Sequence, residues 1–285
     1  MSQFRSNVLT GLVALPLVNA LGHLLPVMGT AWAVAGEFTL NPPVLILNFS
    51  SWMILDVYDK YKDMPRGSKP SRSSFLAWIG LFFLAAIWAT YQCGWDVAVC
   101  VFRLLWLELL WPTPSIPTYS REGGIRLVKL KSILGVGKSA FCGILAGLMD
   151  TQASAVYTCS QHPSRCSSMV VPRKAMAYGA LYSFVRETVY DARDIEEDNQ
   201  QGTATLPTAI GLRTTMLVLG LTTAVGEMLI AGAEWRYLHM LARTLFSVGV
   251  TSLVLKYPRR YNAAWALFCA LSLIPAFQGQ IDLLL

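Results

Sequence analysis

The sequence predicts an all-α, polytopic membrane protein, and composition and the spacing of apolar runs are the two observations that predict it. Hydrophobic residues make up 54% of the 285 residues and charged residues 14%, against roughly 45–50% and about 25% in soluble domains. A water-soluble globule of this length needs more charge to cover its surface. The same figures exclude a disordered chain and a disulfide scaffold.

Nine apolar runs are long enough, or nearly so, to cross a bilayer as helices, which takes about 20 mostly apolar residues. The first run carries Pro16, Gly22 and Pro26, so we expect it to be kinked or tilted. The predicted spans are 8–34, 42–56, 74–92, 95–112, 133–150, 172–190, 209–232, 237–255 and 261–282. The connections 112–132 and 151–171 are expected to be loops, too short for a soluble domain. Residues 1–285 are therefore expected to form a single membrane-embedded domain.

Basic residues gather on one side of the predicted membrane. With nine spans, the loops on the N-terminal side hold sixteen of the 23 basic residues: Arg5, Lys60, Lys62, Arg66, Lys69, Arg72, Arg121, Arg126, Lys129, Lys131, Arg186, Arg193, Arg213, Lys256, Arg259 and Arg260. The positive-inside rule makes this side cytoplasmic. Topology and anionic lipid explain the net charge of +6, so nucleic acid is not an expected partner. In a eukaryotic cell the expected location is the endoplasmic reticulum membrane.

The six cysteines are too few for a disulfide framework. Cys159 and Cys166 flank a polar loop on the side away from the cytoplasm, where they could pair or remain free thiols. Spacing alone does not decide between these alternatives. The remaining four lie in apolar runs and are expected to pack as small hydrophobic residues: Cys93, Cys100, Cys142 and Cys269.

Acidic residues are scarce and concentrated in two short segments on the predicted cytoplasmic side. Nine of the 17 belong to these segments: Asp56, Asp59, Asp63, Glu187, Asp191, Asp194, Glu196, Glu197 and Asp198. Each segment follows an apolar helix, where ionised carboxylates are costly unless they are paired or bound to metal. In a continuous helix, the aspartates of the first segment line one face, and so do the residues from Glu187 to Asp198 spaced at three- and four-residue intervals.

Carboxylates stacked in this way repel one another unless a cation lies between them. Mg²⁺ prefers oxygen ligands and typically joins one or two carboxylates to substrate phosphates. Two opposed acidic faces therefore favour a diphosphate site with Mg²⁺ as cofactor, whereas the alternative interpretation is a solvated, charged helix end. The predicted metal ligands are Asp56, Asp59, Asp63, Glu187, Asp191, Asp194 and Asp198. The basic residues expected to bind diphosphate are Lys60, Arg66, Arg72, Arg126, Lys129, Lys131 and Arg193.

Polar residues inside the spans have less specific interpretations. Asn48 lies two helical turns before Asp56 and is expected either to reach the diphosphate or to bond one helix to another. The stretch Gly135–Ser139 resembles the end of a phosphate-binding loop, but no strand precedes it, so helix packing explains its glycines. Lys138 is expected to snorkel to the interface or to face the cavity mouth. Interfacial placement or a partner charge explains Asp150 and Glu227 at least as well as catalysis does.

The second acidic segment resembles a motif of a known family. It reads Val185-Arg186-Glu187-Thr188-Val189-Tyr190-Asp191-Ala192-Arg193-Asp194-Ile195-Glu196-Glu197-Asp198, followed by Gly202-Thr203-Ala204-Thr205-Leu206-Pro207 and Gly211. This stretch is similar to the second aspartate motif of the UbiA superfamily of intramembrane prenyltransferases. In the first motif the three aspartates match, whereas Leu55 stands where the family has asparagine. The segment Pro65–Arg72 keeps only the basic and proline character of the family pattern.

The resemblance implies a nine-helix bundle around a central cavity that holds the isoprenoid tail. It implies that Asp56, Asp59, Asp191 and Asp194 are catalytic, acting with Mg²⁺ on a prenyl diphosphate substrate. The departures in the first motif favour the terpene cyclase branch, notably the fungal enzymes. That branch needs π faces to stabilise a carbocation, and the aromatic candidates are Trp32, Trp52, Trp78, Trp88, Trp106, Tyr178, Tyr182 and Phe184.

The expected function is therefore Mg²⁺-dependent cyclisation of a linear prenyl diphosphate, farnesyl diphosphate to a sesquiterpene hydrocarbon, with release of diphosphate. The alternative is a prenyltransferase that moves the isoprenoid onto an aromatic or quinone-precursor acceptor. A cation-coupled transporter is disfavoured because the carboxylates gather at one end of the spans and no internal repeat is visible. Besides the substrate and the lipid bilayer, no obligate protein partner is evident.

Overall fold

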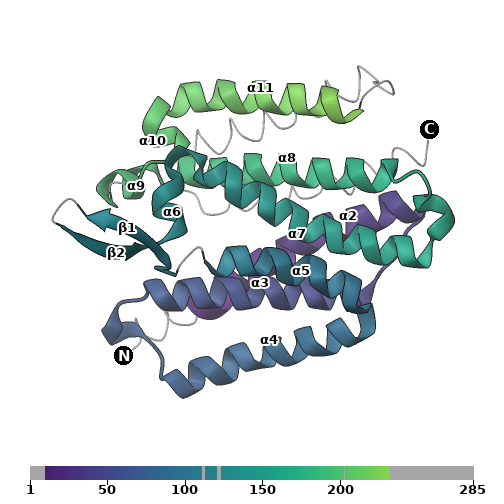
Figure 1. The fold of residues 1–285 in the computed structure, drawn as a ribbon, viewed down its shortest axis with the longest axis horizontal. Helices are drawn as coiled ribbons and strands as arrows, with labels where there is room; N and C mark the ends of the chain where they lie inside the picture. Colours follow the sequence, from purple (N-terminus) through teal and green to yellow (C-terminus); the bar gives the residue numbers. More distant parts are fainter. Residues whose placement is uncertain (1–9, 111–112, 121–122, 202, 232–285) are drawn as a thin grey trace.

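The computed structural model describes residues 10–110, 113–120, 123–201 and 203–231, which form a bundle of long helices running in alternating directions (Figure 1). In chain order the helices are α2 (Leu15–Ala35), α3 (Pro42–Asp63), α4 (Arg72–Cys93), α5 (Trp95–Leu109), α6 (Leu130–Leu134), α7 (Lys138–Gln161), α8 (Val170–Arg193), α9 (Ile195–Gln201), α10 (Leu206–Ile210) and α11 (Leu212–Ala231). Shorter turns are η1 (Thr10–Ala14), η2 (Arg66–Ser68), η3 (Gly135–Gly137) and η4 (Pro163–Cys166).

The first seven predicted spans correspond to long helices, which confirms the mainly helical, membrane-type fold. By length and composition, three helices of the described part are apolar enough to cross a membrane: Gly11–Ala35, Arg72–Cys93 and Leu212–Ile230. Helices α3, α7 and α8 carry more polar residues, some of which are buried, such as Asn48, Asp150 and Arg186. The predicted spans 237–255 and 261–282 lie outside the described residues, so a count of nine spans stays a prediction.

The fifth predicted span is displaced along the chain, and the reason is buried polarity. The prediction ended it at Asp150, whereas α7 continues to Gln161, so the following loop is shorter than expected. Hydroxyl groups in the added turns are buried and donate to backbone carbonyls. Thr151 Oγ1 donates to Gly147 O (2.6 Å) and Ser154 Oγ to Val27 O of α2 (2.6 Å). Such residues lower the apolar signal of a segment without preventing its burial.

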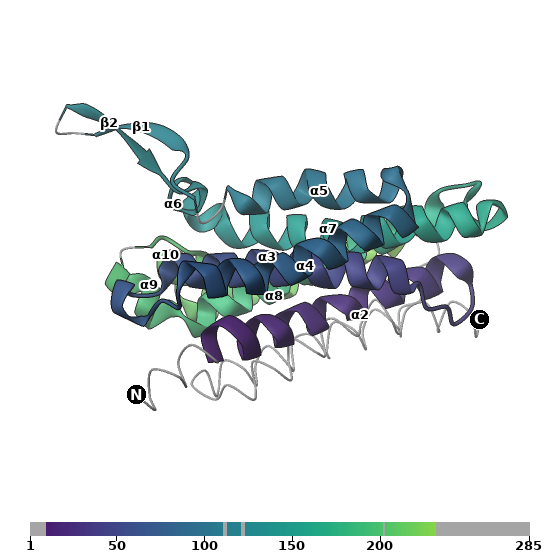
Figure 2. The ribbon, with the colours of Figure 1, turned by 90° about the horizontal axis from the view of Figure 1, so that it is seen from below.

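The predicted loop 112–132 contains a β-hairpin that sequence analysis did not foresee. Strand β1 (Ile116–Ser120) pairs antiparallel with β2 (Gly124–Val128), so that Ile116 lies opposite Val128. Gly123, in the connecting turn, has a φ of +83°, a value that glycine tolerates more easily than other residues. The hairpin projects from one end of the bundle (Figure 2).

Helices α7 and α8 pack most closely, because glycines let their backbones meet. A Cβ added to Gly147 of α7 would overlap the carbonyl oxygen of Gly179 of α8, and one added to Gly143 would overlap the backbone of Phe184. The two helices therefore approach at a distance that larger residues would forbid. This contact fixes the ends of both helices relative to one another.

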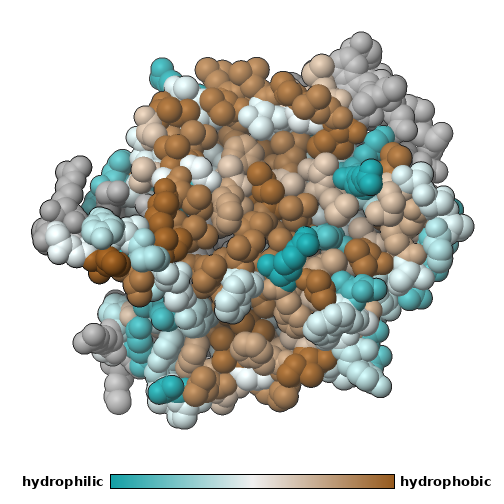
Figure 3. All heavy atoms as spheres, viewed as in Figure 1, coloured by the Kyte–Doolittle hydropathy of each residue, from teal (hydrophilic) through white to brown (hydrophobic). Residues whose placement is uncertain are grey.

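The outer surface of the bundle is strongly apolar. Large hydrophobic side chains that α4 and α11 expose include Leu81, Leu84, Ile87, Leu217, Leu221 and Leu229. Figure 3 shows the face of the molecule that is seen in Figure 1. Hydrophobic residues cover most of the middle of this face, with few hydrophilic ones among them. A soluble monomer rarely exposes so continuous an apolar surface, which agrees with a bilayer around the helices.

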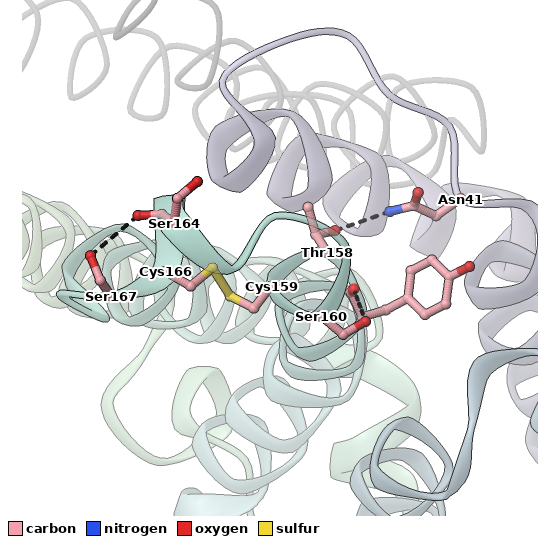
Figure 4. The surroundings of a disulfide bond; sticks show 8 residues. Asn41, Thr158, Cys159, Ser160, Ser164, Cys166 and Ser167 are labelled. Carbon is pink, nitrogen blue, oxygen red and sulfur yellow. Dashed lines mark hydrogen bonds between the residues drawn. A yellow bond between two sulfur atoms is a disulfide. The ribbon is translucent and has the colours of Figure 1, made fainter.

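Cys159 and Cys166 form a disulfide with Cα atoms 5.5 Å apart (Figure 4). It joins the last turns of α7 to η4, next to the hydrogen bond from Asn41 Nδ2 to Thr158 Oγ1 (3.0 Å). Along α7 and α8 this bond lies at the end opposite to Asp191. Disulfides persist in oxidising compartments; that the aspartates at the other end face the cytoplasm stays a prediction.

We expect the denatured, unreduced protein to bind two fewer maleimide–polyethylene glycol adducts than the reduced protein, because two of its six cysteines are paired. Gel mobility of protein from intact membranes measures the difference. Cys166→Ser should abolish the reduction-dependent shift, whereas Cys142→Ser should preserve it. If reduction leaves the number of adducts on the wild-type protein unchanged, the disulfide between Cys159 and Cys166 is contradicted. An oxidising environment at that end of the bundle would be contradicted with it.

Candidate functional site

The two aspartate segments lie at the same end of the bundle, where α3 and α8 end and α7 begins (Figure 1). On α3, the carboxylate of Asp56 accepts a hydrogen bond from Asn19 Nδ2 of α2 at 2.6 Å. Asp59 and Lys60 act on it electrostatically from the same helix, and Glu187 does so from α8. This electrostatic effect links the two segments, whereas a metal site shared by both stays a prediction.

The second half of the site is centred on Asp191, near the end of α8. Lys138 Nζ lies 2.9 Å from Asp191 Oδ1, and the Ser139 hydroxyl donates to the other carboxylate oxygen. Both donors belong to the first turn of α7, directly after η3. The stretch Gly135–Ser139 thus brings a charge and a hydroxyl to the aspartate. Sequence analysis assigned its glycines to packing and left Lys138 without a defined partner.

The prediction of one continuous helical face from Glu187 to Asp198 is wrong. Helix α8 ends at Arg193, Asp194 has non-helical torsion angles (φ −94°, ψ 12°), and α9 begins at Ile195. The Asp198 amide still donates to the Asp194 carbonyl (2.9 Å). The break turns α9 to a new direction, so Asp198 reaches the site from a separate short helix.

The Thr205-Leu206-Pro207 stretch holds Asp198 in place. Thr205 is fully buried; it caps α10, and its amide donates to Thr208 Oγ1 (2.8 Å). Thr205 also hydrogen-bonds the Asp198 carboxyl. Burial raises the pKa of that carboxyl, whereas the nearby charge of Lys138 opposes the rise. This geometry gives Thr205, at its spacing after the aspartates, a role in positioning Asp198.

The residues present suit a divalent cation with oxygen ligands. Oδ2 of Asp198 is buried and has no hydrogen-bond partner among the described residues, and a cation would satisfy such an atom. No group of three or more His, Cys, Asp or Glu side chains in the described part converges as a complete metal site. Mg²⁺ does not require one, because it commonly takes one or two carboxylates together with substrate phosphates and water.

The structure brings few of the predicted diphosphate-binding residues to the aspartates. Lys60 lies beside Asp56. Arg72 is exposed at the start of α4, Arg126 is exposed on the projecting hairpin, and Lys129 follows that hairpin. Asn48 is used for helix-to-helix bonding, since its Nδ2 donates to Asp150 (3.0 Å). The side chains of the remaining predicted residues lie outside the described part: Asp63, Arg66, Lys131 and Arg193.

A polar cluster that sequence analysis missed lies deeper in the bundle. Asp150 of α7 is fully buried, and its Oδ1 accepts hydrogen bonds from Asn48 Nδ2 and from Trp52 Nε1 (2.7 Å), both of α3. Its Oδ2 lies 2.6 Å from Nδ1 of His23 of α2. The prediction that Asp150 lies at the membrane interface is thus wrong. The alternative, a partner charge, agrees better with the structure, because Arg186 of α8 acts on Asp150 electrostatically. The missed signal was an aspartate, a histidine and an asparagine in separate apolar spans.

Comparisons with known proteins agree with this architecture. The sequence model of the VviA prenyltransferase family matches residues 6–283. A structure of a UbiA homologue from Aeropyrum pernix K1 is similar at a TM-score of 0.60 and 16% identity, covering 92% of this chain and 98% of that one. A structure reported for digeranylgeranylglyceryl phosphate synthase in membranes is similar at a TM-score of 0.58 and 13% identity, covering 98% and 99%. No curated protein sequence matches the chain.

These findings support the prenyltransferase alternative better than the terpene cyclase expected from the first motif. The matched family model is one of prenyltransferases and spans almost the whole chain. The two structures are under 25% identical to this chain and therefore establish the fold alone.

Proposed function

Because the chain belongs to the VviA prenyltransferase family, we propose that it is a Mg²⁺-dependent membrane enzyme that ionises a prenyl diphosphate and transfers the isoprenoid to an aromatic or quinone-precursor acceptor. The observation that carries the proposal is the placement of the two aspartate segments at the same end of an apolar bundle. Glu187 of α8 acts electrostatically on Asp56 of α3, and Lys138 supplies positive charge beside Asp191. Carboxylates that can bind a cation, together with a basic side chain nearby, form a site suited to binding a diphosphate.

The chain's own residues account for most of the proposed chemistry. Bound Mg²⁺ would neutralise the charge that develops on the leaving diphosphate, held by Asp56, Asp59, Asp191 and Asp198. Lys138 and Lys60 add fixed positive charge near the leaving group. Asn19, Ser139 and Thr205 orient the carboxylates by hydrogen bonds. The apolar helices around the site exclude water that would otherwise capture the carbocation.

One observation favours cyclisation as a second candidate. Leu55, buried at 7% exposure, replaces the asparagine of the family's first motif and removes a polar group beside Asp56. Buried aromatic side chains suited to stabilising a cation are also present in Trp52, Tyr178 and Tyr182. A cyclase would need no second substrate, so the two candidates differ in whether an acceptor is required.

A membrane assay separates the candidates. Membranes containing the protein receive Mg²⁺ and geranyl, farnesyl or geranylgeranyl diphosphate, with and without 4-hydroxybenzoate as an acceptor probe. We expect pyrophosphate release that stops on chelation of Mg²⁺ and a prenylated aromatic product seen by liquid chromatography–mass spectrometry. A cyclic hydrocarbon formed without acceptor, seen by gas chromatography–mass spectrometry, would instead support the cyclase. No pyrophosphate release with any of the three substrates, with or without acceptor, would contradict both.

A further inference from the structure

The β-hairpin at the end of the bundle has one apolar face that is open in the described part of the chain. Tyr119 lies opposite Ile125, and Pro117 lies opposite Leu127. Residues directly opposite one another in a hairpin point to the same side, so these four form one face, the apolar hairpin face. Tyr119 is 87% exposed, Ile125 68% and Leu127 58%. A two-stranded hairpin is marginally stable in water by itself, so this face favours contact with another surface.

The opposite face of the hairpin is polar toward its tip and carries positive charge. Thr118 lies opposite Arg126 there, and the Thr118 hydroxyl donates to the Arg126 carbonyl oxygen (3.3 Å). Ile116 and Val128 also belong to this face, at the base of the hairpin, where both are half-buried. Residues 116–131 contain one acidic residue, Glu122, and four basic residues: Arg121, Arg126, Lys129 and Lys131. An apolar face combined with basic residues is typical of elements that bind anionic lipid surfaces.

The position of the hairpin places it near the headgroups of a bilayer around the helices. It leaves the end of the bundle toward the side on which α5 lies (Figure 2). On that helix Trp106 is 65% exposed, and it lies about one turn before α5 ends at Leu109. Tryptophan is enriched at the level where membrane helices reach the headgroups. A hairpin that extends sideways from this level would lie over lipid.

We propose that the hairpin docks on the anionic surface of the bilayer that surrounds the bundle. The apolar hairpin face enters the boundary between headgroups and acyl chains, where amphipathic elements bury their apolar side by about 5–10 Å. Arg126, on the opposite face, stays at the level of the lipid phosphates. The chain continues from the hairpin through α6 and η3 to Lys138. Docking therefore ties the segment that contacts Asp191 to the membrane surface.

Fluorescence quenching of the full-length protein in nanodiscs tests the contact with lipid. The four cysteines other than Cys159 and Cys166 are replaced by alanine, and Tyr119→Cys or Thr118→Cys then receives an environment-sensitive fluorophore. The two positions are neighbours in the chain and lie on opposite faces. In nanodiscs of phosphatidylcholine and phosphatidylglycerol, lipids with a nitroxide near the headgroup should quench the label at Tyr119→Cys. Acrylamide should quench that label about threefold less than the label at Thr118→Cys, because an interfacial position excludes water.

Replacing Arg126 tests the preference for anionic lipid. With phosphatidylglycerol present, Arg126→Gln should lower the ratio of docked to undocked hairpin about fivefold, the effect of one basic side chain at an anionic surface. The two fluorescence lifetimes of the Tyr119→Cys label give this ratio. In phosphatidylcholine alone, Arg126→Gln should leave it unchanged. Arg213→Gln is the matched control, because Arg213 is an exposed arginine at the start of α11 and outside the hairpin, and it should have no effect in either lipid.

The other outcomes overturn the proposal. Equal quenching of both labels by acrylamide would show that water surrounds the hairpin on both faces. Protection of the Tyr119→Cys label from acrylamide without quenching by the nitroxide lipids would show that protein covers the apolar hairpin face. An equal effect of Arg213→Gln would assign the lipid preference to net charge and not to the hairpin. Ile125→Cys, on the same face, is the second label position if Tyr119→Cys does not fold, and the test needs no substrate, so its result is independent of the proposed function.

Discussion

Replacing Asp191 with asparagine is expected to lower the turnover of prenyl diphosphate about 100- to 1,000-fold, the usual loss when one preorganised charged group is removed from a site. Asp191 is 6% exposed and accepts from Lys138 and Ser139. Asparagine has nearly the same shape as aspartate but lacks the negative charge that would bind a cation. Pyrophosphate release in membranes containing equal amounts of folded protein measures the effect. Asp96→Asn, which alters an exposed carboxylate at the opposite end of the bundle, should be silent.

A double variant separates catalysis from stability. Asp191→Asn leaves the Lys138 ammonium without its carboxylate, which in a fully buried pair costs about 3–5 kcal/mol. The cost should be smaller here, because the Lys138 side chain is 22% exposed. Replacing both residues by apolar ones, Asp191→Leu with Lys138→Met, should restore thermal stability but not turnover. Recovery of turnover in the double variant would show that the pair is structural, and the site would have to be placed elsewhere.

The second large effect is expected at the crossing of α7 and α8. Gly147→Ala should destabilise the protein by about 3 kcal/mol, at the upper end of the usual range for overpacking. The added Cβ would overlap the backbone of Gly179 and not a movable side chain. For a chain of this size, that loss corresponds to a melting temperature lower by roughly 6–12 °C. Thermal denaturation in detergent, followed by size-exclusion chromatography, provides the measurement.

Gly80→Ala is the matched control for this prediction. Gly80 lies inside α4, and a Cβ there meets nothing within 4 Å. The same substitution should therefore stabilise the protein by about 0.5–1 kcal/mol, because alanine has the higher helix propensity. Opposite signs for the two substitutions would establish that backbone contact, and not helix propensity, decides the effect. Equal effects would mean that α7 and α8 do not approach as closely as the glycines allow.

The aspartate segments show what a local pattern can predict. Spacing and placement after apolar helices indicated that the segments belong together, and both lie at the same end of the bundle, where Glu187 acts electrostatically on Asp56. The pattern could not predict the break at Asp194, because one continuous helix and two shorter ones share the same three- and four-residue periodicity over this length. The break is associated with α10, whose Thr205 holds Asp198.

The pattern of apolar runs was enough to predict the fold class, and the acidic segments were enough to predict at which end of the bundle the proposed chemistry lies. Apolar runs predict membrane helices because backbone groups in lipid can hydrogen-bond only within the helix. Acidic residues are scarce in this chain, so the two segments that concentrate them indicate where a charged site would lie. Which residues are neighbours, in contrast, became visible only from the way the helices pack. Asn19, Lys138 and Asp150 lie far from their partners in the chain, and their hydrogen bonds depend on how α2, α3, α7 and α8 cross. A single sequence carries no signal for such contacts, because burial depth and helix rotation are set by packing against other helices.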